Sequence, residues 1–349
     1  MFKKIAVVPV VLSTAIYSVL FPISTAINSY AQTEPAAARS ALAFSTYFGG
    51  GKRNWQEQTY GAGIAVDKQG YVYITGKTAA RDYPSVNPAQ KKYGGGGQDA
   101  FIAKFTPDGQ KLVYSTVLGG GDVDYADRIA VDDSGNAYIA GTTYSRNFPT
   151  TPQAAQRSFG GGDRDGFVAK FSAEGKLVYA TLIGGDETDR CRAIDVDGAG
   201  NAYVTGSTNS GKFAVLTGTP SEHPRKDWDV LVAKLDPSGS KFTYVFRFGG
   251  TAGNAPQKHG FGGESGAGIK VGGSNTVYVV GYTDSADFPI RNGVQSKFGG
   301  RSDGFVVRLG ARGADLVSST YIGGAGSDRS GFGISRSRRT RSRVKKQTI

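Results

Sequence analysis

A ten-residue segment recurs along the chain and constrains its fold more than any other feature. In one copy, Asp132 to Gly141, the sequence reads Asp-Asp-Ser-Gly-Asn-Ala-Tyr-Ile-Ala-Gly, which is a tight turn followed by a short apolar strand. A period of this size is typical of repeat proteins, in which each unit buries its faces against its neighbours. The spacings are 65, 65 and 75 residues, because the copies close on Gly76, Gly141, Gly206 and, in divergent form, Gly281.

Each repeat contains four apolar strands in a fixed order. In the second repeat they are expected at 128–131, 137–139, 165–171 and 177–185. These strands are apolar on both sides instead of alternating, which fits sheets that are sandwiched between other sheets. The first strand of each repeat is rich in Gly, Ala and Val, as suits the crowded innermost position of a radial array. The sequence therefore predicts an all-β fold, a β-propeller of four-stranded antiparallel blades.

The connections between these strands are unequal in length. Tight turns such as Asp67 to Gly70 join the first strand to the second, and similar turns join the third to the fourth. The second-to-third connection is long, as in Lys77 to Gln98, and the crossing to the next blade is moderately long. In an antiparallel blade both long connections lie at the same end, which we call the long-loop face. We expect ligand binding there, because binding residues concentrate on loops held by a rigid scaffold.

The repeat pattern predicts four full blades and a partial repeat at each end. Leu42 to Gly50 has the pattern of a fourth strand without the preceding three, which predicts an N-terminal extra strand. Ser330 to Ile334 begins a fifth repeat, which is truncated because Ser335 to Arg341 breaks the pattern. We therefore expect an open four-blade arc that self-associates through its open blade edges, rather than a closed ring. A purposeful basic tail is the competing interpretation of the last residues.

The first residues read as a targeting segment. Residues 1–31 are predicted to be a secretory signal peptide, with Lys3 and Lys4 before an apolar run and small residues at Ser29 and Ala31. An uncleaved membrane anchor is the alternative. We expect an extracytoplasmic protein that is periplasmic, secreted or at the cell surface, and that has no membrane contact once the signal peptide is removed.

The net charge of +12 is concentrated at the ends of the chain. Residues 325–349 hold eight basic residues and one acid, and this basic tail is expected to be disordered. The predicted repeat region, 42–324, follows an Ala-rich linker at 32–41 and is nearly balanced in charge. The charge of the folded part therefore gives no indication of a nucleic-acid partner.

Several of the recurring motifs together resemble the SBBP type of bacterial β-propeller repeat, over roughly residues 42–332. The resemblance implies a secreted or surface-associated bacterial protein with a propeller fold. That family has no agreed activity, so the resemblance implies no catalytic residue. The motifs that carry it in the second repeat are Gly135 to Thr143, Asn147 to Thr151, Gly160 to Gly162, Asp165 to Lys170 and Leu177 to Gly185.

Recurring aspartates begin the third strand of every blade. A catalytic pair forms one asymmetric site, whereas a residue that every blade repeats serves the blade itself. We expect these carboxylates to accept backbone N–H bonds from the preceding Gly-rich loop. Acid-rich stretches lack the full pattern of a calcium loop, and the glycine runs precede strands instead of helices. No catalytic residue, metal or cofactor is therefore predicted, and the aspartates concerned are Asp99, Asp165, Asp229 and Asp303.

Three residues of the long-loop face are candidates for ligand binding. His223 and His259, the only two histidines, fall on long connections of adjacent blades, and Trp228 lies close to His223 in sequence. Cys191, the single cysteine, begins an innermost strand, where a buried and inert thiol is expected. His223, Trp228 and His259 are thus the candidate ligand-binding residues, and the alternative is that the two histidines are exposed loop residues without a third clustered ligand.

Two classes of function fit this sequence. The first is a non-catalytic scaffold that binds a protein or a polysaccharide through the long-loop face. The alternative is an extracytoplasmic propeller enzyme that acts on glycans as a lyase or hydrolase. An enzyme requires charged residues from several blades to converge on the axis, yet the inner strands are mostly apolar. This favours the scaffold, although the inner strands contain the charged exceptions Arg128, Arg192, Asp195 and Lys270.

Overall fold

The computed structural model describes residues 44–51, 57–213, 228–251, 263–311, 313 and 315–328. All of them belong to one compact unit that begins at Ala43. The predicted signal peptide, the linker, His223, His259 and all but the first four residues of the basic tail lie outside the described residues. Within the described part of the chain, no helix is long and apolar enough to cross a membrane.

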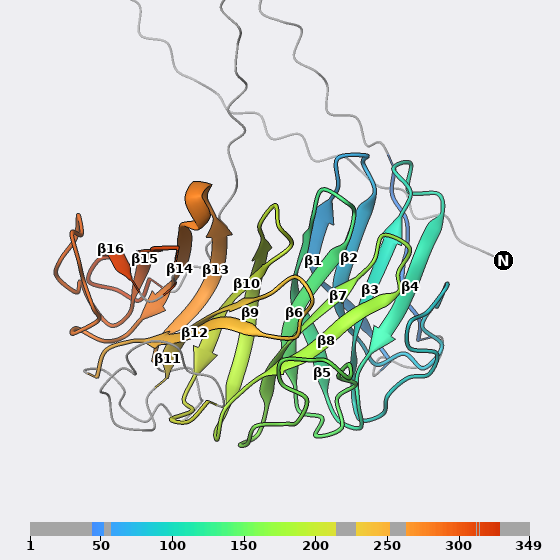
Figure 1. Ribbon diagram of the computed structural model, residues 1–349, viewed down its shortest axis with the longest axis horizontal. Coiled ribbons are helices and arrows are strands. Elements are labelled where there is room, and N and C mark those ends of the chain that lie inside the picture. Colours follow the sequence, from blue (N-terminus) through green and yellow to red (C-terminus); the bar gives the residue numbers. More distant parts are fainter. Residues whose placement is uncertain are drawn as a thin grey trace, which may run out of the picture. The chain divides into compact units, whose positions relative to one another are not determined.

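Four four-stranded antiparallel sheets make up the fold (Figure 1), which confirms the predicted class. In each sheet the strands follow one another in chain order, and the described residues contain only one short 3₁₀ turn, Gly273–Asn275. The strands are β1 (Thr59–Val66), β2 (Val72–Thr78), β3 (Asp99–Phe105), β4 (Leu112–Leu118), β5 (Asp124–Val131), β6 (Ala137–Thr143), β7 (Asp165–Phe171), β8 (Leu177–Ile183), β9 (Asp189–Val196), β10 (Ala202–Thr208), β11 (Asp229–Leu235), β12 (Phe242–Phe248), β13 (Ser265–Val271), β14 (Val277–Thr283), β15 (Asp303–Leu309) and β16 (Leu316–Ile322).

The four sheets lie side by side as blades. Contacts run from β1 to β5, from β5 to β9 and from β9 to β13, so the first strand of each blade is innermost. Figure 1 shows the first and fourth blades at opposite ends of the row, and the sheets do not close into a ring. The prediction of an open four-blade arc is therefore confirmed for the described residues.

The apolar core lies between consecutive blades. Between the first two, Tyr73 and Ile102 pack against Ala126, Ile129 and Phe167 of the next blade. A blade in the middle of the row buries both of its faces in this way, and every residue of β6 is buried. This explains why the strands are apolar on both sides instead of alternating.

The segment 44–50 was expected to be an extra strand, and the structure differs in this detail because the segment forms no strand pairing. Its placement nevertheless follows the repeat. A Cβ on Gly109 in the first blade would lie 2.3 Å from the Phe44 ring, just as one on Gly175 in the second blade would lie 2.4 Å from the ring of Tyr114 in the first blade. Phe44 thus lies against the turn of the first blade as Tyr114, a fourth-strand residue, lies against the turn of the second.

The outer face of the first blade is only partly covered. Phe48 packs its ring 5.4 Å from Tyr83 and 5.2 Å from Phe105, and so shields the outer half of that face. Near the inner edge, Ile64 is 69 % exposed. The residues at the same repeat position, which a preceding blade covers, are 5–8 % exposed, and they are Ile129, Ile194 and Ile269.

Candidate functional site

The recurring aspartates bind backbone N–H groups, as the sequence predicts. Gly160 N–H donates to Asp165 Oδ2 over 2.7 Å, and Asp99 and Asp303 accept equivalent bonds from the glycine runs before them. The third blade differs because its sequence lacks that glycine run. There the Nε of Arg247 forms an ion pair with Asp229 at 3.0 Å. These carboxylates are buried within the blades, and their hydrogen bonds and ion pair give them a structural role.

A second buried carboxylate, which sequence reasoning missed, lies beside three of them: Asp124 beside Asp99, Asp189 beside Asp165 and Glu264 beside Asp229. Gly120 N–H donates to Asp124 Oδ2 over 2.8 Å. A Cβ on Gly119 would lie 2.5 Å from Asp99 Oδ1 and 2.7 Å from Asp124 Oδ2, so the two carboxyl groups are close neighbours. The sequence signal is an acid four residues after a Gly-Gly pair, which recurs at Asp189.

Burial dominates the ionisation of these groups. It raises the pKa of Asp99, Asp165 and Asp189 to about 7, that of Asp124 to about 6 and that of Glu264 to about 8. The neighbouring carboxylate adds to the shift in Asp99 and Asp165. Because such a pair occurs at several blade junctions, it is part of the repeat and does not mark a single reaction centre.

A different set of residues departs from the repeat and gathers at the long-loop face. Its centre is Asp127, which is half-buried in β5. The cations that act on its carboxylate are, in decreasing order, Arg192, Arg128, Arg190 and Lys77. Burial still raises the pKa of Asp127 to about 6, since it outweighs the cations. With Arg164, which lies near Arg190, we call these basic residues the cationic cluster: Lys77, Arg128, Arg164, Arg190 and Arg192.

A β-bulge presents part of the cationic cluster. The strand register shifts at the same point in β1, β5, β9 and β13, and the residue that loses its pairing partner is Asp127 in β5 and Arg192 in β9. Bulges redirect a side chain and are frequent next to functional sites. The equivalent residues of the first and fourth blades are alanines, Ala62 and Ala267. The bulge therefore belongs to the repeat, whereas the charges on it belong only to the two middle blades.

Aromatic rings hold three of the cations in place. The guanidinium of Arg190 lies 5.3 Å from the ring centre of Trp228, and that of Arg164 lies 5.1 Å from the ring of Tyr144, whose hydroxyl also accepts a hydrogen bond from Arg164. Such contacts favour a fixed position of the cation over the ring. In the same way, Lys77 Nζ lies 5.5 Å from the Tyr60 ring and 5.8 Å from the Tyr125 ring.

The cationic cluster holds like charges close to one another. The Nε atoms of Arg164 and Arg190 are buried and have no hydrogen-bond partner among the described residues. Burial lowers the pKa of Arg190, and the positive charges of Arg164 and Arg192 lower it further. Like charges held together in this way favour a bound anion, which reduces their mutual repulsion.

The sequence-predicted site residues are only partly placed by the structure. Trp228 is half-buried at the long-loop face and contacts the cationic cluster through Arg190, while His223 and His259 lie outside the described residues. Cys191 is buried with a free thiol, and burial raises its pKa, which agrees with an inert role. No group of three or more His, Cys, Asp or Glu residues that could hold a metal occurs in the described ranges.

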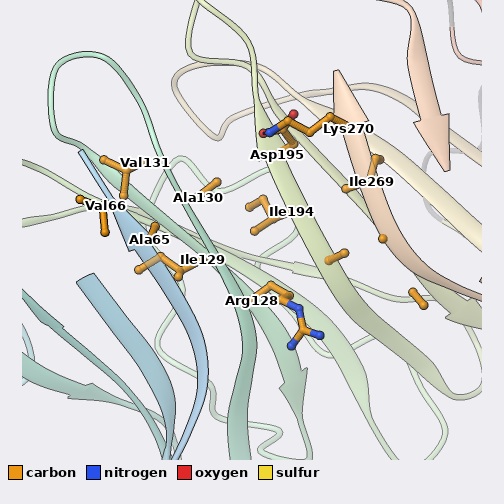
Figure 2. A pocket seen from close by; sticks show the side chains of 13 residues that line it. Ala65, Val66, Arg128, Ile129, Ala130, Val131, Ile194, Asp195, Ile269 and Lys270 are labelled. Atoms are coloured by element: carbon orange, nitrogen blue, oxygen red, sulfur yellow. The ribbon is translucent and has the colours of Figure 1, made fainter. Parts of the chain in front are cut away.

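A cavity of about 460 Å³ lies along the innermost strands. Figure 2 shows the apolar side chains of Ile129, Ile194 and their neighbours around it, with the Asp195–Lys270 pair well separated from Arg128. Lys270 Nζ and Asp195 Oδ1 are 2.7 Å apart and neutralise each other. Arg128 lines the cavity and also belongs to the cationic cluster, so the cavity and the cluster share one residue.

Comparisons with known proteins identify the repeat type but assign no activity to this chain. No curated protein matches this chain. A solved structure, a "putative hydrolase" from Bacteroides ovatus, shares 12 % identity at a TM-score of 0.35, over 82 % of this chain and 73 % of that one, which is too weak to carry an argument. The model of the SBBP β-propeller repeat matches residues 43–84, 113–149 and 178–214, and each match begins with a fourth-strand segment. The chain therefore contains β-propeller repeats of the SBBP type.

Proposed function

We propose that the chain is a non-catalytic, extracytoplasmic scaffold that binds a protein or polysaccharide ligand through its long-loop face. The observation that carries this proposal is the cationic cluster, whose residues come from three blades. A repeat protein needs the same contacts in every blade, whereas a ligand site needs residues that differ between blades. The extracytoplasmic location rests on the composition of residues 1–31 alone.

The chemistry of the cluster favours binding over glycan cleavage. Most glycoside hydrolases place two carboxyl groups about 5–10 Å apart on either side of the scissile bond. The groups that act most strongly on Asp127 are all cations. The paired carboxylates of the blade junctions are buried and accept backbone hydrogen bonds. A binding role therefore uses the groups that the long-loop face offers, while hydrolysis requires a carboxylate pair that the cluster does not supply.

A ligand screen tests this proposal. The secreted form of the protein is immobilised and exposed to a glycan array and to a protein pull-down, in parallel with the variant Arg164→Ala/Arg190→Ala. The control variant is Lys241→Ala. It removes an exposed cation from the turn between β11 and β12, at the end of the blades opposite the long-loop face. We expect the ligand to be lost with the double variant and retained with the control. Turnover of a glycan, or a ligand that neither variant affects, would contradict the proposal.

A further inference from the structure

We propose that the cationic cluster binds the anionic groups of an acidic polysaccharide, such as uronate carboxylates or sulfates. This inference rests on the proposed function and adds the chemical class of the ligand. The repeat provides an internal reference for every residue of the cluster, because each has equivalent positions in the other blades.

The repeat shows that the fold does not need these cations. The residue before the third strand is Arg164 in the second blade, but Gln98 and Ser302 in the first and fourth blades. The second residue of the innermost strand is Arg190 in the third blade and Tyr125 in the second. The blades form the same four-stranded sheets with or without the charge. A cost in like-charge repulsion that brings no structural gain indicates a ligand of opposite charge.

The geometry of the guanidinium groups suits carboxylates and sulfates. Arginine presents a planar fork of donors that binds two oxygens of an anion at once. Arg164 and Arg190 are both held over aromatic rings, and both side chains are only half-buried. Donors that are fixed in place before the ligand arrives lose little conformational entropy on binding. The two guanidinium groups are thus positioned before an anion binds.

A polysaccharide fits this arrangement better than a nucleic acid. Proteins that bind single-stranded nucleic acids stack the bases on open aromatic faces. Here the rings of Tyr144 and Trp228 each have a guanidinium over one face, so their role is to position the cation. The repeat region as a whole is nearly balanced in charge, so the attraction is confined to this patch. Anions distributed along a sugar chain match a local patch of fixed cations.

The test measures binding of the full-length chain to polygalacturonate, to chondroitin sulfate, to neutral dextran and to oligo-dT. The variants take their side chains from other blades, Arg164→Gln as in Gln98 and Arg190→Tyr as in Tyr125, so each new side chain already occurs in the same repeat environment. Lys241→Gln is the control for general loss of charge. We expect each cluster substitution to weaken binding of an acidic polysaccharide by about tenfold or more, and the control to leave it unchanged.

The outcomes separate this inference from the proposed function. Binding of polygalacturonate or of chondroitin sulfate that the cluster variants lose supports the inference, and the stronger of the two identifies the anion. A protein or neutral glycan that binds the long-loop face while acidic polysaccharides do not bind overturns the inference but leaves the scaffold function standing. Oligo-dT binding that is at least as strong and equally sensitive to the variants overturns it in favour of a nucleic acid. Polysaccharide binding that the cluster variants leave unchanged also overturns it.

Discussion

Replacing Asp165 by alanine tests the structural role of the recurring carboxylates. Asp165 is fully buried, and its Oδ2 accepts the N–H of Gly160 over 2.7 Å. Removing the carboxyl group leaves that buried donor without an acceptor, which costs about 1–3 kcal/mol of unfolding free energy. We expect a loss of this size in Asp165→Ala, without any effect on ligand binding at the long-loop face.

The size of the loss depends on pH in a defined direction. Burial raises the pKa of Asp165 to about 7 in the folded protein, from an ordinary value near 3.8. The folded state therefore holds a proton that the unfolded state has released, and the stability contributed by this group falls as pH rises from about 4 to about 7. Asp165→Ala lacks this titration, so its deficit relative to the parent protein is larger at pH 5 than at pH 8.

Urea denaturation at pH 5 and pH 8, followed by circular dichroism, measures both effects. Asp163→Ala is the matched control, because Asp163 is exposed two residues earlier in the same loop. Asp165→Asn is a second comparison, since it keeps an acceptor for Gly160 and removes the titration. An unchanged denaturation midpoint in Asp165→Ala at pH 5, together with a lost ligand, would refute the structural interpretation of these aspartates.

Three further predictions concern the flanks, the open face and a turn. N-terminal sequencing should show that the mature chain begins near Gln32. A chain that still begins at Met1 and is found in an integral membrane fraction would instead indicate an uncleaved membrane anchor. Ile64→Asp should reduce concentration-dependent association in analytical ultracentrifugation without loss of stability, whereas Ile129→Asp at the equivalent buried position should cost more than about 3 kcal/mol. Gly175→Ala should lower stability by about 1–3 kcal/mol in thermal denaturation, because Gly175 has φ of 86° and its Cβ would lie 2.4 Å from a tyrosine ring. Gly198→Ala, where a Cβ meets nothing within 4 Å, is its control and should change stability by less than about 0.5 kcal/mol.

The fold was predictable from the sequence because the same four-strand pattern recurs in all four blades. Each copy of the pattern supports the same assignment of four strands. The aspartates that begin the third strands recur together with these copies. The N-terminal segment was harder, because its pattern is that of a strand although residues 44–50 form no strand pairing. The rings of Phe44 and Phe48 nevertheless contact the first blade at the positions of a fourth strand.

The cationic cluster could not be predicted in the same way. A repeat is recognised by what recurs, whereas Arg164 and Arg190 are departures from it. The overall charge also concealed the cluster, because acids elsewhere balance the cations when the repeat region is taken as a whole. Sequence reasoning noted Arg128 and Arg192 as exceptions in the inner strands, but only the structure brings them together around Asp127. The departures become visible when equivalent positions of the blades are compared, as Arg164 is with Gln98 and Ser302.

The tyrosine of the recurring ten-residue segment joins neighbouring blades. The hydroxyl of Tyr73 donates to Asp67 Oδ2 in its own turn over 2.9 Å and lies 3.1 Å from the carbonyl oxygen of Gly135 in the next blade. The equivalent Tyr138 hydroxyl lies beside Gly200. The first two junctions are therefore alike and link only adjacent blades. Under a stretching force applied to the two ends, we expect such an arc to extend one blade at a time, releasing roughly 220 Å of chain for a 65-residue repeat at about 3.4 Å per residue.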